Sequence, residues 1–575
     1  MQTGVCHYQL IMRKTLLIFG MIILSYLSLI SLFGTDIILL SEDGSSYNYF
    51  LDDNVLRHLV FLAILLIVSV VLGKTVLRFS LRKLILIWFL IVFIIGTWVI
   101  FTLELPPAND SYDIMAAARG ILTGDFAMFE KNGYMYRYPD QRGMVILCIV
   151  FIRVFGDNCC LWLQEMNLIM VIGIVCELAF LCRLFFNSRK VIASVLIFLF
   201  SFIPLYMYAL LVYGTIGGIF FSLACVILCI IAKKKEKAFF YLPAALCMAF
   251  AYQIKANSLI WLIGIVIILL WSGISSFVSK SHKTGLSSIV AIFVIVFMCV
   301  VSSIASGAVM ERLTGIELSK GMPKSAWIYM GLMDNEDAPG AYNGHSVQLF
   351  EENDYDYKKT DAAAKENIVE ICGYIVHNPV KSVRQFAKKI SYQWNNPTFM
   401  CINNLESMSS LLNKNDLPGW FRSLIAGGGK RFITSWMNIV QTWILLFALM
   451  GIIVLFRSET GIWQILPCLI FIGGFAFHFF WEAKPQYTLP YFILLLPYAA
   501  CGLSASVEGV GKLRMLISKK SKSDKIRLRK KISLVVIIMA ALVVFRFTGV
   551  FRTTIEMRSS DERVEQFIDI EGNLP

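Results

Sequence analysis

Long apolar runs alternate with short polar stretches along most of the chain, and this pattern decides its structural class. A helix that crosses a bilayer needs about 20 predominantly apolar residues. The runs that approach or reach this length are 15–33, 56–73, 84–103, 160–182, 191–212, 214–232, 238–254, 258–277, 286–306, 434–455, 462–480, 487–506 and 532–550. The pattern predicts an all-α polytopic membrane protein with about 13 transmembrane helices.

The first apolar run, 15–33, follows Arg13 and Lys14, as the apolar part of a secretory signal also would. No small-residue cleavage site comes after it, and the run is long enough to span. We therefore expect a retained helix.

Basic residues gather in every second loop between the runs, and this orients the chain. The loops on one side contain Arg78, Arg183, the cluster 233–237, Lys280, Arg457 and the run 512–531. The loops on the other side contain acidic stretches at 36–53 and 334–361. Because cytoplasmic loops carry an excess of Lys and Arg, we expect the basic loops inside and the regions 104–142 and 307–432 outside.

This orientation requires that the apolar stretch 143–156 does not span. The stretch is short for a span and carries Arg153. We expect it to lie in the outer interface as a helix. Counting it as a span would move every later basic cluster to the outside.

The spans and polar regions divide the chain into five parts. They are N-terminal accessory helices (1–83), a transmembrane core (84–306) with an outer loop at 104–159, an extracytoplasmic domain (307–432), C-terminal transmembrane helices (433–550) and an outer tail (551–575). We expect the extracytoplasmic domain to be mainly helical, with helices over 362–377 and 380–394 separated by Asn378-Pro379. The Gly-, Asn- and acid-rich region 331–358 predicts a loop.

Composition supports the membrane class and excludes one alternative. The chain is 57% hydrophobic and 16% charged, against about 45–50% and 25% in soluble domains. Its net charge of +13 would suit nucleic acid, but the charge lies in short loops between spans, so we expect no nucleic-acid partner. Of the 14 cysteines, most lie in apolar runs, and only Cys372 and Cys401 fall in the large polar region, where the sequence does not decide whether they pair.

Asp110 follows the third apolar run and begins a short amphipathic segment. Ile114, Ala118 and Leu122 share one helical face, and Gly124 is placed to end the helix. Such a helix would lie flat on the bilayer with Asp110 at headgroup depth. Asp110 has two compatible interpretations, an N-cap of the helix and a catalytic carboxylate that is positioned at the membrane edge for a lipid headgroup.

Three cations are expected outside, against the general charge bias. Arg137 and Arg142 lie in the first outer loop, and Lys255 follows the run 238–254. Each side chain could snorkel to outer headgroups. Alternatively, the guanidinium groups suit a phosphate, and an ammonium near apolar depth should face a cavity or an anion.

The short outer segment between the runs 462–480 and 487–506 contains Glu482, Lys484 and Tyr487. An ordinary loop with interfacial aromatic anchors would have this composition. A substrate-binding turn would have it as well, and both interpretations stay open.

Taken in order, these segments resemble a known superfamily. An Asp follows an early span, and a helix then ends in Leu122-Thr-Gly-Asp125. The motif Tyr138-Pro-Asp-Gln-Arg-Gly143 follows, then a short apolar helix ending in Phe155-Gly-Asp-Asn158, then a span with Leu163-Gln-Glu-Met-Asn167. The chain resembles the GT-C superfamily of polyprenyl-phosphate-sugar-dependent glycosyltransferases over roughly 84–306 and 460–506. It is most similar to the branch of the protein O-mannosyltransferases and the lipid A aminoarabinose transferase.

The resemblance implies roles for the residues singled out above. Asp110 corresponds to the family's presumed catalytic base, and Arg137 to the basic residue that contacts lipid phosphate. The resemblance adds Arg142, Lys255, Glu482, Lys484 and Tyr487 as substrate-binding residues. Where the family usually has a second acid, this chain has Ser111, which weakens the case for a metal-assisted site. A divalent metal stays an open alternative, and no other cofactor is implied.

The function implied by the resemblance is transfer of a sugar from a polyprenyl phosphate to an extracytoplasmic glycan, glycopolymer or lipid-linked acceptor. The site would face outward from the plasma membrane of a bacterium. The alternatives are a lipid-linked glycan transporter or flippase, and a glycan polymerase or ligase.

Overall fold

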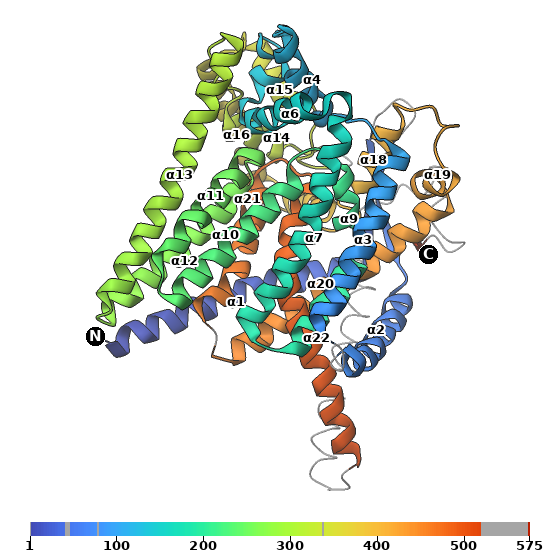
Figure 1. Ribbon diagram of the computed structural model, residues 1–575, viewed down its shortest axis with the longest axis vertical. Helices are drawn as coiled ribbons and strands as arrows, with labels where there is room; N and C mark the ends of the chain where they lie inside the picture. Colours follow the sequence, from blue (N-terminus) through green and yellow to red (C-terminus); the bar gives the residue numbers. More distant parts are fainter. Residues whose placement is uncertain are drawn as a thin grey trace.

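The computed structural model describes residues 2–40, 46–76, 80–335, 338–459, 461–518 and 573–574. Long helices form a bundle, and shorter helices cover one end of it (Figure 1). The bundle helices are α1 (Gln2–Phe33), α2 (Val55–Val76), α3 (Leu81–Leu103), α7 (Cys159–Phe186), α8 (Arg189–Ser201), α9 (Ile203–Met207), α10 (Thr215–Lys235), α11 (Tyr241–Ile254), α12 (Ser258–Val278), α13 (His282–Thr314), α20 (Gly428–Arg457), α21 (Leu466–Phe480) and α22 (Leu489–Ser518). The all-α polytopic prediction is confirmed.

The predicted number of spans is not established. Nine helices of the described chain are long and apolar enough to cross a membrane, or ten if the bent pair α8–α9 is one span. The shorter apolar helices Val55–Val71 and Ala238–Ile254 correspond to two further predicted runs. The run 532–550, most of the tail and the basic stretch beyond Ser518 lie outside the described residues.

Burial separates central helices from peripheral ones. Of the apolar window in α22, 78% is buried inside the protein, and in α10 the share is 72%. In α3, which is apolar on every side, only 6% is buried. A helix that is hydrophobic all round and yet exposed is suited to a lipid surrounding, so α3 lies at the periphery of the bundle.

A bend of 61° separates α8 from α9. Pro204, at the start of α9, has no backbone N–H to donate. After the bend the chain forms the short 3-10 helix η4 (Tyr208–Leu210), where the Tyr208 hydroxyl donates to the Phe399 carbonyl at 2.6 Å. The bend thus turns the chain toward the helix ends, where the cavity described below lies.

The segment 104–159, predicted to be an outer loop, contains α4 (Asp110–Thr123), α5 (Tyr134–Arg137) and α6 (Arg142–Phe155). Helix α4 ends at Gly124 in the left-handed conformation, as predicted. Its apolar residues Ile114 and Met115 are buried in one cluster with Met144 and Val145 of α6. The apolar face of α4 therefore packs on α6, whereas we had expected it to face lipid. The depth of both helices in a bilayer stays a prediction.

The segment 307–432, which the charge pattern predicts to lie outside, is mainly helical, as expected, but its details differ. It contains α14 (Lys324–Leu332), α15 (His345–Glu352), α16 (Tyr357–His377), α17 (Pro379–Trp394), α18 (Cys401–Ser409) and α19 (Gly419–Ala426). Helix α16 begins earlier than predicted because the Asp356 side chain accepts from the backbone N–H groups of Lys358 and Lys359. The loop prediction for 331–358 is wrong over α15, an eight-residue helix too short to give a clear apolar period.

The remaining short elements are 3-10 helices and strands. The 3-10 helices are η1 (Ala127–Phe129), η2 (Pro139–Gln141), η3 (Gly156–Asn158), η5 (Ala238–Phe240), η6 (Ile462–Ile465) and η7 (Pro485–Thr488). Strands β1 (Gly34–Leu40) and β2 (Ser46–Asp53) form an antiparallel hairpin, and β3 (Asn573–Leu574) pairs with β2. The sequence analysis did not predict the hairpin.

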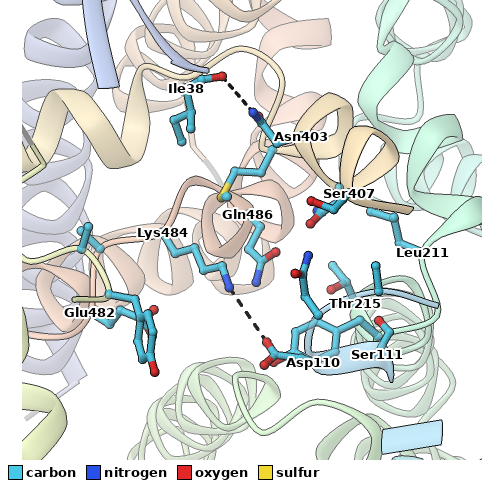
Figure 2. Close-up of a pocket in the computed structure, with 18 of the residues that line it drawn as sticks. Ile38, Asp110, Ser111, Leu211, Thr215, Asn403, Ser407, Glu482, Lys484 and Gln486 are labelled. Atoms are coloured by element: carbon cyan, nitrogen blue, oxygen red, sulfur yellow. Dashed lines mark hydrogen bonds and ion pairs between the residues drawn. The ribbon is translucent and has the colours of Figure 1, made fainter. Parts of the chain in front are cut away.

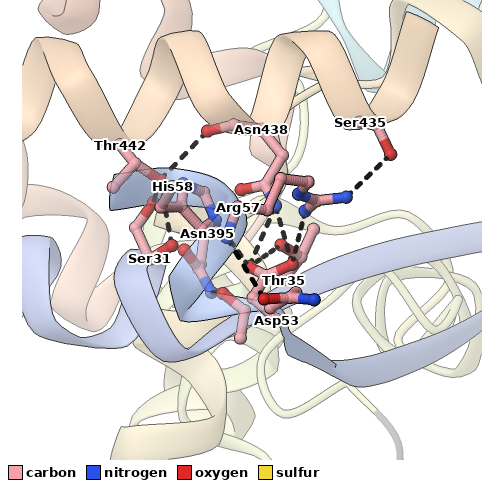
Figure 3. Close-up of polar contacts among 11 residues, drawn as sticks. Ser31, Thr35, Asp53, Arg57, His58, Asn395, Ser435, Asn438 and Thr442 are labelled. Atoms are coloured by element: carbon pink, nitrogen blue, oxygen red, sulfur yellow. Dashed lines mark hydrogen bonds and ion pairs between the residues drawn. The ribbon is translucent and has the colours of Figure 1, made fainter. Parts of the chain in front are cut away.

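A buried polar network anchors the hairpin to the bundle (Figure 3). Asp53, at the end of β2, is fully buried and accepts hydrogen bonds from Thr35 at 2.6 Å and from the Asn438 amide at 2.8 and 2.9 Å. Arg57 pairs with the same carboxylate at 3.3 Å, and the His58 ring lies 3.6 Å from it. A buried carboxylate is tolerated only when it is paired and hydrogen-bonded, so this network fixes the hairpin on α20.

Removal of the Asp53 carboxylate tests the anchor. Asp53→Ala leaves Arg57 buried beside Asn438 without its counter-ion, and loss of one partner of a buried pair typically costs about 3–5 kcal/mol. We expect a fall of this size in the free energy of unfolding, measured in mixed micelles. Glu508→Ala is the control, because it breaks the exposed pair with Lys190 and should cost about 0–1 kcal/mol. Equal losses would show that the network does not anchor the hairpin.

Candidate active site

A cavity of about 610 Å³ opens among the ends of the bundle helices, within the range usual for small-molecule sites. Segments far apart in sequence line it: the hairpin, 107–111, 208–215, 335–343, 392–408 and 482–486. Asp110, Glu482 and Lys484 are its only charged lining residues among those described. Figure 2 shows side chains from these segments pointing toward one another.

Asp110 is the first residue of α4 and lines the cavity. The N-cap is Asn109, and no side chain caps this helix. The N-cap interpretation of Asp110 is therefore wrong by one residue, and its carboxylate is left to face the cavity. Asn109 has φ 53° and ψ −138°, a backbone conformation that is costly for any residue except glycine. Local strain thus lies next to the carboxylate.

The Asp110 carboxylate has two partners on other elements. Its Oδ2 lies 4.0 Å from Nζ of Lys484, and it lies close enough to the Tyr213 hydroxyl to raise the pKa of that group further, after the larger effect of burial. About a third of its side chain is exposed, at 36%, and Lys484 is 25% exposed. The carboxylate is thus fixed in place and still reachable from the cavity.

The turn between α21 and α22 supplies three of the predicted residues, Glu482, Lys484 and Tyr487. The segment 307–432 fixes this turn in place, because the Ala483 N–H donates to the Gly340 carbonyl at 2.7 Å. The Lys389 ammonium, from α17, donates to the carbonyls of Gly331, Phe479 (3.0 Å) and Trp481 (2.8 Å). Burial lowers the pKa of Lys389 to about 7. Sequence reasoning missed this residue, since a Lys in an amphipathic helix is normally exposed.

Glu482 is 3% exposed and accepts a hydrogen bond from the Tyr487 hydroxyl at 3.1 Å. Burial raises the pKa of its carboxyl, and the nearby Lys484 partly offsets that shift. Tyr487 also stacks on His478, with ring centroids 5.6 Å apart. Glu482 and Asp110 thus face one cavity in unlike surroundings, one buried and one partly solvated.

Lys255 lies next to the cavity in a small adjoining pocket that it shares with Gln486 and Tyr487. Its ammonium lies 3.5 Å from the centroid of the Tyr213 ring and 5.9 Å from that of Tyr487, a cation–π arrangement. Burial lowers its pKa to about 7, while Asp110 acts in the opposite direction. The chain segment that carries Tyr213 packs closely against the residue before Lys255, and this close packing needs a glycine at position 214. Gly214 has φ 75°, and a Cβ there would lie 2.4 Å from the Ile254 carbonyl oxygen.

The two arginines are placed differently from the lysines. Arg137 does not line the cavity, and its guanidinium lies 5.7 Å from the centroid of the Tyr138 ring. The pKa of Asp113 is raised by burial and by Asp110, and Arg137 partly offsets that rise. Arg142 donates to Ser306 at 2.8 Å and to the Ser303 hydroxyl at 2.6 Å. Arg142 therefore ties α6 to α13, and its side chain is used in the fold.

Two open questions from the sequence have structural answers. Cys372 is exposed and Cys401 is buried, and both are free thiols. Within the described part of the chain, no group of three His, Cys, Asp or Glu side chains is placed to hold a metal ion.

Uncharged residues complete the cavity wall. Gln486 follows Lys484 in the same turn, and Asn403, Asn404 and Ser407 come from α18. The Asn403 amide donates to the Ile38 carbonyl at 2.8 Å, which makes the N-terminal hairpin part of the wall. Only the fold brings these residues together.

Comparisons with known proteins give distant matches. No protein-family model matches the chain, and no curated protein matches it. One similar solved structure is the archaeal oligosaccharyltransferase AglB from Archaeoglobus fulgidus, in complex with an inhibitory peptide and a dolichol-phosphate (11% identity, TM-score 0.34). It is matched over 83% of this chain and 56% of its own. Another is ArnT from Cupriavidus metallidurans in the apo state (13% identity, TM-score 0.30), matched over 74% and 78%.

Both neighbours are GT-C superfamily membrane glycosyltransferases, the superfamily that the sequence motifs also resemble.

The strain at Asn109 can be measured. Asn109→Gly removes the Cβ at φ 53° and should leave stability unchanged or raise it by up to about 1 kcal/mol. Asn109→Ala should cost about 1–2 kcal/mol, because Ala tolerates positive φ poorly. Unfolding in mixed micelles gives both values. Equal stabilities of the Gly and Ala variants would contradict the strained backbone.

Proposed function

We propose that the protein is a membrane glycosyltransferase that moves a sugar from a polyprenyl phosphate to an extracytoplasmic glycan, glycopolymer or lipid-linked acceptor. One observation carries the proposal: Asp110 lies beside Lys484 and close to Lys255 at a cavity between apolar helix ends. A lipid-linked donor needs an apolar path for its chain, cations for its phosphate and a base for the acceptor.

The two lysines are suited to the donor phosphate. Lys484 and Lys255 come from different elements and are both near the Tyr487 ring, at 6.0 and 5.9 Å. In a site shielded from water, fixed cations stabilise charge that develops on a leaving phosphate. Arg137 and Arg142 do not line this cavity, so we assign them no direct contact with the phosphate.

Asp110 acts as the general base. Its carboxylate takes the proton of the acceptor hydroxyl, and the hydroxyl oxygen forms a bond to the anomeric carbon of the donor. The bond from that carbon to the phosphate oxygen breaks, and the electron pair stays on the phosphate. Displacement in one step gives an inverted anomeric centre. Glu482, buried and with a raised pKa, positions Tyr487 and balances the charge of the lysines.

The transporter alternative is less well supported. Transporters place their substrate sites near the bilayer midplane, on broken helices. Here the charged lining residues and the irregular segments gather at one end of the bundle, and the basic loops 233–237 and 280–283 join helices at the other end. We propose that the cavity end faces outward, in the plasma membrane of a bacterium.

Asp110→Asn tests the proposed base. Asn109 is the N-cap, so the substitution disturbs no cap, and the protein should insert and fold normally. Loss of a positioned general base typically lowers the rate by about 10²–10⁴. Transfer from a labelled polyprenyl-phosphate sugar by the purified protein measures this. Asp113→Asn, the matched control, should lower the rate less than about tenfold. Transfer by Asp110→Asn at the parent's rate would contradict the role of Asp110 as the general base.

The pKa of Lys255 predicts a pH dependence. The ammonium exists below about pH 7 and is lost as the pH rises through that value. The KM for the donor should therefore rise above pH 7, approaching about tenfold per pH unit, and level off below it. Lys255→Arg keeps the charge at every working pH and should remove the slope. The same slope in the Arg variant would mean that another group titrates.

A further inference from the structure

Gln486 is a buried amide without a partner in the described part of the chain. Its side chain is 6% exposed, and it lines both the main cavity and the small pocket of Lys255. The amide faces the cavity, so its donor and acceptor are open to a bound molecule. A few polar groups placed in this way fix the orientation of a ligand in a binding site.

The position of Gln486 says which part of a substrate it would meet. Lys484 lies two residues before it, and its amide points into the cavity on the same side as the Lys484 ammonium and the Asp110 carboxylate (Figure 2). Lys255 lies in the small adjoining pocket, which Gln486 also lines. In the proposed reaction, the group between the phosphate and the base is the ring of the transferred sugar.

The surroundings favour an uncharged ring. Apart from Asp110, Glu482 and Lys484, the described lining residues of the cavity are neutral, and six of them are asparagines. An amide donates through its NH₂ and accepts through its oxygen, which matches two neighbouring hydroxyl groups. The amide offers no counter-ion to an amino or carboxylate substituent, and the two charged residues of the same turn are already paired, Glu482 with Tyr487 and Lys484 with Asp110. An unpaired charge at a buried position is costly.

We infer that Gln486 is a specificity-determining residue that hydrogen-bonds two hydroxyl groups of the transferred sugar, so that the donor carries a neutral sugar. The inference rests on the proposed function and adds the class of sugar. Gln486 does not take part in the proton transfer. Its loss should change which donor is used, while the role of Asp110 stays the same.

The test compares three polyprenyl-phosphate donors on the purified full chain: a neutral hexose, a sugar with a free amine and a uronic acid. Dissociation constants and transfer rates are measured separately for each donor. The parent should prefer the neutral donor by at least about tenfold in both. Gln486→Met, which keeps the side-chain length, should weaken binding of the neutral donor by about 10- to 100-fold. The preference for the neutral donor over the two charged donors should shrink accordingly.

A charged variant and a buried control sharpen the test. Gln486→Glu should favour the amine donor, because it supplies the missing counter-ion. Gln393→Met is the control: Gln393 is also a buried amide, 1% exposed, but does not line the cavity. It should leave the order of the three donors unchanged.

The outcomes separate the two ideas. If the parent binds all three donors equally, or if Gln486→Met keeps the parent's order, the specificity role is overturned. If the parent binds the neutral donor selectively, Gln486→Met abolishes that selectivity and no sugar is transferred, the recognition role stands and the proposed glycosyltransferase function fails.

Discussion

The architecture depends on one constraint, that a backbone N–H or C=O in hydrocarbon must find its partner within the protein. Long stretches of this chain satisfy it as helices, and irregular backbone is confined to helix ends and breaks. The segments 211–214, 338–343 and 482–484 are irregular, and all three line the cavity. Irregular backbone therefore occurs at the same end of the bundle as the polar side chains of the cavity.

Buried cations hold this irregular end together. The Lys389 ammonium donates hydrogen bonds to three carbonyls from two separate segments, and the Lys255 ammonium lies over the Tyr213 ring. Each ion is costly to desolvate, and the lowered pKa values of both residues record that cost. Because Lys389 fixes the turn that carries Lys484, a residue outside the cavity decides where the proposed phosphate-binding ammonium lies.

The sequence predicts the parts of this arrangement that depend on local chemistry. Apolar length located the bundle helices, and helix signals located α4, α16 and α17. Sequence reasoning also singled out Asp110, Lys255, Glu482, Lys484 and Tyr487, which the structure brings together, because charged groups beside apolar runs are unusual. It misplaced Arg142, whose partners Ser303 and Ser306 lie more than 160 residues away. The hairpin could not be found, since its strands are held by segments that only the folded chain supplies.

The hairpin network has a consequence for biosynthesis. Asp53 and its partner Asn438 are separated by 385 residues. At translation rates of about 5–20 residues per second, Asn438 is made roughly 20–80 s after Asp53. During that interval the hairpin, which forms one wall of the cavity, cannot dock on α20. The wall of the cavity is therefore completed only late in synthesis. Until then the N-terminal helices lie in the membrane with the Asp53 carboxylate still hydrated at the membrane surface.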